Sequence, residues 1–93
     1  MNPDRSLQVV VKTGKVLIGS NETLEAVKRG QTKLVVLASN CPNHVRAEVE
    51  TKVKTFDYPG TSTDLGVTCG KPYAIAALAV TDPGESDILA VLR

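Results

Sequence analysis

The sequence predicts an α/β fold, a three-layer α/β/α sandwich with one central, mixed four-stranded sheet. Short apolar runs typical of strands alternate with segments whose apolar residues recur at helical spacing. Such alternation places helices on both faces of a single sheet. The 93 residues, 42% hydrophobic and 23% charged, match one globular domain over residues 1–93, without repeats or linkers.

The predicted elements begin with a helix and then alternate. In chain order they are a helix between Asn2 and Gly14, a strand at 15–19, a helix at 20–30, a strand at 33–39, a helix ending at 50, a strand at 53–58, a short helix from Thr61, a strand at 73–82 and a helical end within 82–92. The run at 33–39 is continuously apolar, which indicates a strand covered on both faces.

Polar residues at the helix starts predict side-chain caps. The expected caps are Asn2, with Pro3 at the favoured first position, then Ser20 or Asn21, then Asn43, and finally Thr61 with Asp64, which have capping-box spacing.

Charge is spread unevenly along the chain. The net charge is +1, which does not by itself indicate nucleic-acid binding. Residues 1–46 hold seven Lys/Arg and three acids, whereas residues 47–93 hold four Lys/Arg and seven acids. This asymmetry is compatible with a basic surface on one side of the protein. No apolar run reaches the roughly 18 residues of a membrane span, and the start lacks a signal-peptide pattern, so a cytosolic protein is expected.

Catalytic and metal-binding interpretations find little support. The stretch 19–23 follows a strand as a phosphate-binding turn does, but it contains neither common nucleotide-binding motif. His44 is the only histidine and is expected at the surface, while Cys41 and Cys69 are expected as free loop or core residues. A turn and a helix start explain three nearby acids better than a metal site does: Asp82, Glu85 and Asp87. No catalytic residue, metal or cofactor is predicted.

Three polar junctions between strands and helices form the candidate site: residues 19–22, 38–44 and 60–73. Strand ends of this kind lie along one edge of an α/β sheet and bind ligands there. In the first junction, Asn21 and Glu22 carry an amide and a carboxylate that can read base edges. Capping and turn chemistry can explain each junction alone, but the three together favour a binding site.

The other candidate residues supply glycines for close backbone approach, polar groups and cations. From the second and third junctions they are Asn40, Gly66, Gly70, Lys71 and Tyr73. The expected phosphate contacts are Lys28, Lys33 and Arg46.

Three stretches resemble a known family: "TGKVLIGSNETLEAVKRGQTKLVVLASNCP", "GTSTDLGVTCGKPY" and "DPGESDILAVL". They are similar to the archaeal–eukaryotic large-subunit ribosomal proteins of the thirty-e family, within a superfamily of kink-turn RNA-binding proteins. The resemblance runs from about residue 7 to residue 92. It implies an α/β/α sandwich whose loops grip a sharply bent RNA internal loop with tandem G·A pairs.

The resemblance also implies roles for individual residues. In junction 19–22, Gly19, Asn21 and Glu22 are expected to lie in the groove against the G·A pairs, and Ser20 is a further RNA-binding candidate. Asn40 belongs to a neighbouring loop, loop 60–70 surrounds an unstacked nucleotide, and Tyr73 can place its ring against a base.

Two departures from the family pattern stand out. Sister branches often carry a lysine where this chain has Glu25, which argues against a general kink-turn protein. The segment between Glu50 and Phe56 is shorter than in the family, so the third helix ends early, the connection is taut, or residues are missing from the sequence.

The predicted function is therefore that of a non-enzymatic structural constituent of the large ribosomal subunit, which binds a kink-turn-type rRNA internal loop. The expected partners are rRNA and neighbouring ribosomal proteins, with no membrane, on the cytoplasmic ribosome, and the isolated protein is expected to be a monomer. One alternative is a kink-turn component of another RNA–protein particle, which the C-terminal stretch and Glu25 disfavour. The others are an enzyme that binds a phosphate-bearing small molecule and a protein-interaction domain.

Overall fold

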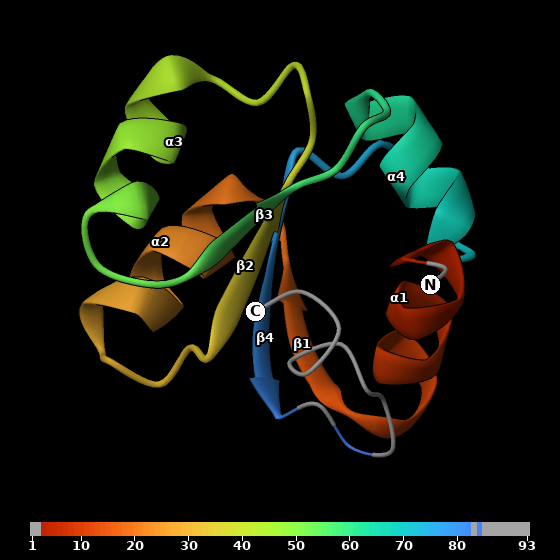
Figure 1. Ribbon diagram of the computed structural model, residues 1–93, viewed down its shortest axis with the longest axis horizontal. Coiled ribbons are helices and arrows are strands. Elements are labelled where there is room, and N and C mark those ends of the chain that lie inside the picture. The colour runs from red at the N-terminus through yellow and green to blue at the C-terminus, as the bar shows by residue number, and fades with distance from the viewer. Residues whose placement is uncertain (1–2, 83, 85–93) are drawn as a thin grey trace.

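The computed structural model describes residues 3–82 and residue 84. In this part of the chain, helices and strands alternate as the sequence predicts (Figure 1). The elements are α1 (Pro3–Thr13), β1 (Lys15–Ile18), α2 (Ser20–Lys28), β2 (Leu34–Leu37), α3 (Asn43–Glu50), β3 (Thr55–Asp57), α4 (Ser62–Thr68) and β4 (Ala77–Asp82).

The four strands form one mixed sheet in the order β1-β4-β2-β3. β4 is antiparallel to both of its neighbours, and β2 is parallel to β3. The carboxyl ends of β1, β2 and β3 therefore lie at the same end of the sheet as the amino end of β4. We call this the loop end, formed by residues 19–22, 38–42, 58–62 and 71–76.

Helices cover both faces of the sheet, with α2 and α3 on one face and α1 and α4 on the other (Figure 1). Side chains alternate along β2, because successive residues of a strand point to opposite faces. Leu34 and Val36 join the core beneath α1 and α4, whereas Val35 and Leu37 join the core beneath α2 and α3. All four are fully buried, which confirms the prediction of a strand covered on both faces.

Two of the predicted side-chain caps are wrong. The N-cap of α2 is Gly19, and Ser20 and Asn21 lie inside the helix. The N-cap of α3 is Pro42, and Asn43 is the first helical residue; neither helix has a side-chain cap. For α2 the reason is the sharp turn that follows β1. It needs a φ of 110°, which glycine adopts readily and other residues do not, so the helix starts directly after the glycine.

The capping box predicted for α4 is confirmed. Thr61 Oγ1 accepts the N–H of Asp64, and the Asp64 carboxylate accepts the N–H of Thr61 at 3.1 Å. The structure also defines the short connection between α3 and β3. The helix ends at Glu50, and the chain turns within four residues so that Lys54 accepts the N–H of Val35 at 3.0 Å.

All four strands are shorter than predicted: β1 ends at Ile18, and β2 contains only Leu34–Leu37. β3 contains only Thr55–Asp57, and β4 begins at Ala77 rather than at residue 73. The start of β4 is delayed because residues 71–74 run back along α4, where the Tyr73 carbonyl lies against Gly66. The predicted Asn2 cap and the helical end predicted after Asp82 lie outside the described residues.

Candidate nucleic-acid interface

Backbone hydrogen bonds join the three predicted junctions at the loop end. The N–H of Gly19, at the end of β1, donates to the carbonyl of Ala77 at 3.0 Å. The N–H of Ala38, at the end of β2, donates to the carbonyl of Ala76 at 2.9 Å. Since Ala76 and Ala77 lie at the start of β4, the first two junctions lie on either side of the amino end of that strand, which follows the third junction.

A second set of bonds ties the start of α4 to the same place. The N–H of Ser39 donates to the carbonyl of Gly60 at 2.9 Å, and that of Ile75 donates to the carbonyl of Ser62 at 2.9 Å. The Asn40 side chain accepts the N–H of Ser62 at 2.8 Å and donates to its hydroxyl at 3.2 Å. The junctions therefore form one connected unit rather than three independent loops.

Asn21 and Glu22 project from the first turn of α2 beside this unit. Both side chains are exposed, and neither forms a hydrogen bond or ion pair with any other described residue. Because α2 has no side-chain cap, the N–H groups of its first turn are also available to a ligand. One turn further on, Glu25 lies 3.6 Å from Arg29 on the exposed face of the helix.

Tyr73 borders a shallow hollow of about 340 Å³ between α4 and the returning chain. Its ring is 53% exposed, and Val67 in α4, which lines the same hollow, is 71% exposed. Val67 is not among the residues predicted from the sequence. The signal that could have found it is helical spacing, because Leu65 and Cys69 define the buried face of α4 and Val67 falls off that face.

The two glycines predicted from the third junction have different surroundings. Gly66 is buried within α4, and a Cβ placed there would lie 2.0 Å from the carbonyl oxygen of Tyr73. Its small size therefore sets the path of the Tyr73 segment. Gly70 follows α4 with a φ of +74°, and a Cβ there would meet open space.

Arg46 is held by groups of the protein itself. Its guanidinium pairs with Asp57, lies 3.6 Å from Glu50 and donates to the carbonyl of Ala38 at 3.2 Å. The hydrogen bond that Arg46 donates to the Asp57 carboxylate raises the pKa of Arg46 further above its usual value. These contacts fasten α3 to the ends of β2 and β3, so the predicted phosphate contact also has a structural role.

Lys28 and Lys33 are not brought together with the loop residues. Lys28 is the last residue of α2, a helix of nine residues that rises about 13 Å from its start at the loop end. The N–H of Lys33 donates to the carbonyl of Val80, which places it near the start of β2 and the end of β4. Both lysines lie at the opposite end of the sheet.

The remaining candidates match their expectations. His44 is exposed, and Cys41 and Cys69 are buried and outside any disulfide. Burial raises the pKa of the Cys41 thiol, which disfavours the reactive thiolate. Within residues 3–82 and 84, no group of three or more His, Cys, Asp or Glu side chains could hold a metal ion. In the same part of the chain, none of the helices has the length and apolar character needed to cross a bilayer.

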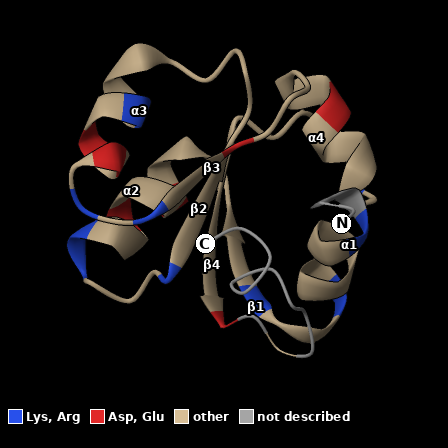
Figure 2. Cartoon of the chain, in the orientation of Figure 1, with Lys and Arg blue, Asp and Glu red and all other residues tan. Residues whose placement is uncertain are grey.

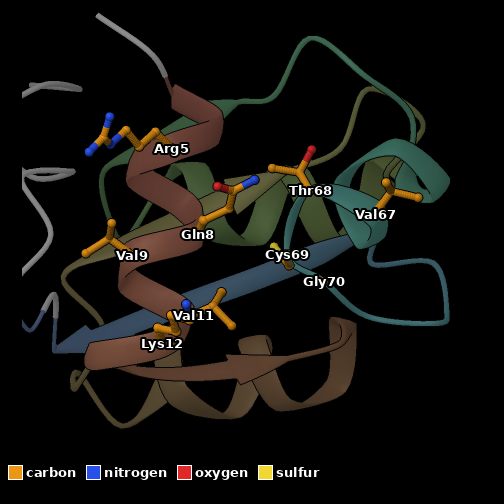
Figure 3. A pocket seen from close by; sticks show the side chains of 9 residues that line it. All are labelled: Arg5, Gln8, Val9, Val11, Lys12, Val67, Thr68, Cys69 and Gly70. Atoms are coloured by element: carbon orange, nitrogen blue, oxygen red, sulfur yellow. The ribbon is translucent and has the colours of Figure 1, made fainter.

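A separate hollow of about 390 Å³ lies between α1 and α4 (Figure 3). Gln8 of α1 and Thr68 of α4 face one another across it. Its lining consists of Arg5, Gln8, Val9, Val11, Lys12, Val67, Thr68, Cys69 and Gly70. These residues include two cations, Arg5 and Lys12, and neither a histidine nor a carboxylate.

The fold and the site together define a small α/β/α domain with polar loops gathered at one end of its sheet. Comparison with known proteins identifies the family. The chain belongs to the ribosomal protein L7Ae/L30e/S12e/Gadd45 family, whose model matches residues 1–90. This confirms the resemblance on which the prediction of a non-enzymatic ribosomal protein rested.

Individual relatives match over nearly their whole length. The chain is 56% identical over 91 residues to the large ribosomal subunit protein eL30 of Methanosarcina mazei, covering 97% of this chain and 88% of that protein. It is 48% identical to eL30 of Methanothrix thermoacetophila, covering 100% and 91%. A solved structure of a protein of unknown function from Bacillus halodurans C matches with a TM-score of 0.76 at 28% identity, covering 98% of this chain and 95% of that one. That match confirms the predicted fold class.

Proposed function

We propose that this protein is a structural constituent of the large ribosomal subunit that binds a kink-turn-type rRNA internal loop through its loop end. The full-length similarity to eL30 proteins supports the ribosomal assignment, with rRNA and neighbouring ribosomal proteins as partners on the cytoplasmic ribosome. The observation that carries the binding mode is the exposed, unpaired state of Asn21 and Glu22 among the described residues.

Asn21 and Glu22 have the chemistry to read bases. An amide both donates and accepts, and a carboxylate accepts from amino and imino groups of a base. An RNA internal loop exposes such groups, because its bases are not all held in Watson–Crick pairs. Arg29, a cation further along the same helix, already lies within reach of Glu25, so it does not compete for these side chains.

Tyr73 supplies a surface for an unstacked base. Its ring is 53% exposed beside Val67, so a base can lie against it without rearrangement of the core. Stacking of a base on an aromatic side chain is worth about 1–3 kcal/mol. Lys71 lines the same hollow, and we expect its ammonium group to meet the phosphate of such a nucleotide.

Three residues support the contact surface by fixing its loops: Asn40, Arg46 and Gly66. Asn40 joins the second junction to α4, and Arg46 joins α3 to the ends of two strands. Gly66 lets the Tyr73 segment approach α4 closely. Loops that are fixed before binding lose less conformational freedom when RNA binds, which favours affinity.

A comparison of two RNA hairpins tests the proposal. One contains an asymmetric internal loop with tandem G·A pairs, and the other replaces that loop with Watson–Crick pairs. We expect the second to bind at least about tenfold more weakly, a difference of roughly 1.4 kcal/mol. Crosslinks from the first RNA should map to residues 19–22 and 71–76. Equal affinity for the two hairpins would contradict the binding mode.

Sedimentation separates the ribosomal assignment from the alternative of another RNA–protein particle. A tagged form of the protein, expressed in the organism that encodes it, should sediment with large ribosomal subunits in a sucrose gradient. It should remain with them after a moderate salt wash. Co-sedimentation with a smaller particle that lacks large-subunit rRNA would assign the protein to that particle instead.

A further inference from the structure

The end of the sheet opposite the loop end carries a row of lysines. Lys15 is the first residue of β1, and Lys33 and Lys54 directly precede β2 and β3. We call this surface the lysine end, defined by Lys15, Lys33 and Lys54. Across the sheet the order is Lys15, Asp82, Lys33, Lys54. Neighbouring strands lie about 4.8 Å apart, so the row spans roughly 14 Å.

Helices add further positive charge at the same end. α1 and α2 both finish there, and Figure 2 shows blue segments where these helices end and where β1 and β2 begin. Five lysines of this region are exposed and form no ion pair with any described residue: Lys12, Lys15, Lys28, Lys33 and Lys54.

Among the described residues, the acids of this region offset only part of the positive charge. Glu25 lies 3.6 Å from Arg29, and Glu48 lies 2.8 Å from Lys52, so each already has a partner. Asp82 lies within the row and offsets one of its three positive charges, and its carboxylate also accepts the N–H of Gly84 at 2.9 Å. The lysine end is therefore a basic surface, as the uneven distribution of charge along the sequence indicated.

Ordinary structural explanations account for only part of this surface. Lys12 and Lys28 sit in the last turns of helices, where the helix dipole favours cations. The helix dipole does not explain Lys15, Lys33 and Lys54, because these residues begin or precede strands, which have only small dipoles. Protection of an exposed sheet edge does not explain Lys33 either, since β2 is an internal strand.

An open hollow of about 600 Å³ lies beside the row. Lys15, Arg29 and Gln31 line it, and all three side chains can donate hydrogen bonds, while the Asp82 carboxylate, which also lines it, offsets part of their positive charge. Thr81 adds a hydroxyl, which donates to the carbonyl of Lys15 at 3.0 Å. A concave surface with several donors and excess positive charge suits an anionic group such as a backbone phosphate.

We propose that the lysine end is a second RNA-binding surface, which contacts the phosphate backbone of a duplex segment separate from the internal loop. The proposal rests on the proposed function, because that function makes RNA the partner. Phosphate contacts position a protein without reading sequence, so plain duplex RNA is the expected ligand. Since the two surfaces lie at opposite ends of one sheet, the protein would join two RNA segments.

Charge removal at the lysine end tests this. The triple variant K15Q/K33Q/K54Q should bind a plain RNA duplex at least about tenfold more weakly, with the slope of log affinity against log salt flatter by about 2–3. The matched variant K15R/K33R/K54R keeps the charge and should bind the duplex nearly as well as the original. Circular dichroism and thermal unfolding of both variants confirm that these exposed substitutions leave the fold intact.

Binding of the internal-loop hairpin distinguishes the contribution of the loop end from that of the lysine end. The triple Gln variant should bind a short internal-loop hairpin within about twofold of the original protein, whereas Asn21→Ala should weaken the hairpin and spare the duplex. Immobilised hairpin loaded with protein should capture a labelled duplex, and the Gln variant should capture much less.

Several results would overturn the second surface. They are displacement of the hairpin by the duplex, duplex binding that the Gln substitutions do not weaken, and stronger binding of poly-glutamate than of duplex, which would indicate an acidic protein partner. A protein that binds duplex through these lysines but does not distinguish the two hairpins would contradict the proposed function while supporting the lysine end.

Discussion

The side chain of Asn40 holds Ser62 through both ends of its amide. Its oxygen accepts the backbone N–H of Ser62 at 2.8 Å, and its nitrogen donates to the Ser62 hydroxyl at 3.2 Å. The two residues lie 22 positions apart in sequence, at the end of β2 and the start of α4. Asn40 was predicted as an RNA contact, and this geometry makes it a brace between two loops of the candidate interface.

Substitution of Asn40 should therefore act on stability first. We expect Asn40→Ala to lower the free energy of unfolding by about 1–2 kcal/mol, because the Ser62 N–H loses its acceptor. Asn40→Asp keeps that acceptor and should recover part of the loss. Chemical denaturation of the three proteins measures both effects. If Asn40→Ala kept full stability but lost affinity for RNA, the side chain would be a direct contact instead.

Gly66→Ala should damage both the fold and the interface. The new methyl group would lie 2.0 Å from the Tyr73 carbonyl oxygen, a backbone atom that cannot rotate away. Either α4 or the Tyr73 segment must then move, and overpacking of this kind costs about 1–3 kcal/mol. We expect a lower midpoint of unfolding together with weaker RNA binding in the fraction that remains folded.

Gly70→Ala is the matched control for this collision. A Cβ at Gly70 meets open space, but the residue has a φ of +74°. The expected cost is about 1 kcal/mol from backbone strain alone, without displacement of Tyr73. RNA affinity of folded Gly70→Ala should remain close to that of the original protein. If both variants lost affinity equally, the collision at Gly66 would not be the cause.

Asn21→Ala should weaken RNA binding without lowering stability, which is the opposite of the result expected for Asn40→Ala. The Asn21 side chain does not cap α2, and alanine has the higher helix propensity, so stability should be unchanged or slightly raised. RNA affinity should fall by about 1–3 kcal/mol, the cost of a lost base contact. Isothermal titration with the internal-loop hairpin measures the change. Unchanged affinity in the folded variant would remove Asn21 from the interface.

Local sequence patterns predicted the elements but not the contacts between them. The apolar run of β2 and the capping box of Thr61 and Asp64 depend on residues close in sequence, and both were confirmed. The bond between Asn40 and Ser62 depends on how two distant loops meet, which no local pattern encodes. The α2 cap was mispredicted because Ser20 and Asn21 are good capping residues, while the backbone turn at the preceding position required glycine.

The direction of the strands also decided which predicted cations could act together. Lys28, Lys33 and Arg46 formed one set in the sequence, because all three lie near polar junctions. The parallel arrangement of β1 and β2, both antiparallel to β4, places Lys28 and Lys33 at the far end of the sheet. Only Arg46 remains near the loop end, where Asp57 neutralises it.

This separation predicts a shallow salt dependence for a short internal-loop hairpin. The loop end offers few free cations, since Arg46 is paired and Lys71 is half-buried. A plot of log affinity against log salt should give a slope that matches only a few phosphate contacts, at roughly 0.7–0.9 per contact. A slope that implies on the order of ten contacts would mean that the short hairpin also reaches the lysine end.

Tyr73 should act through its ring rather than its hydroxyl. The ring is 53% exposed and borders the hollow that Val67 and Lys71 also line, whereas its backbone carbonyl is the part that packs against Gly66. Tyr73→Phe keeps the stacking surface and should bind the internal-loop hairpin nearly as well as the original. Tyr73→Leu removes that surface and should bind about 1–3 kcal/mol more weakly.

Stability measurements distinguish this role from simple packing of the ring. Because about half of the ring is exposed, Tyr73→Leu should cost only about 1 kcal/mol or less in the free energy of unfolding. The affinity of each variant is then compared at a temperature where all of them are fully folded. A Tyr73→Leu protein that is clearly destabilised, yet binds the hairpin normally once folded, would show that the ring serves the fold and does not contact RNA.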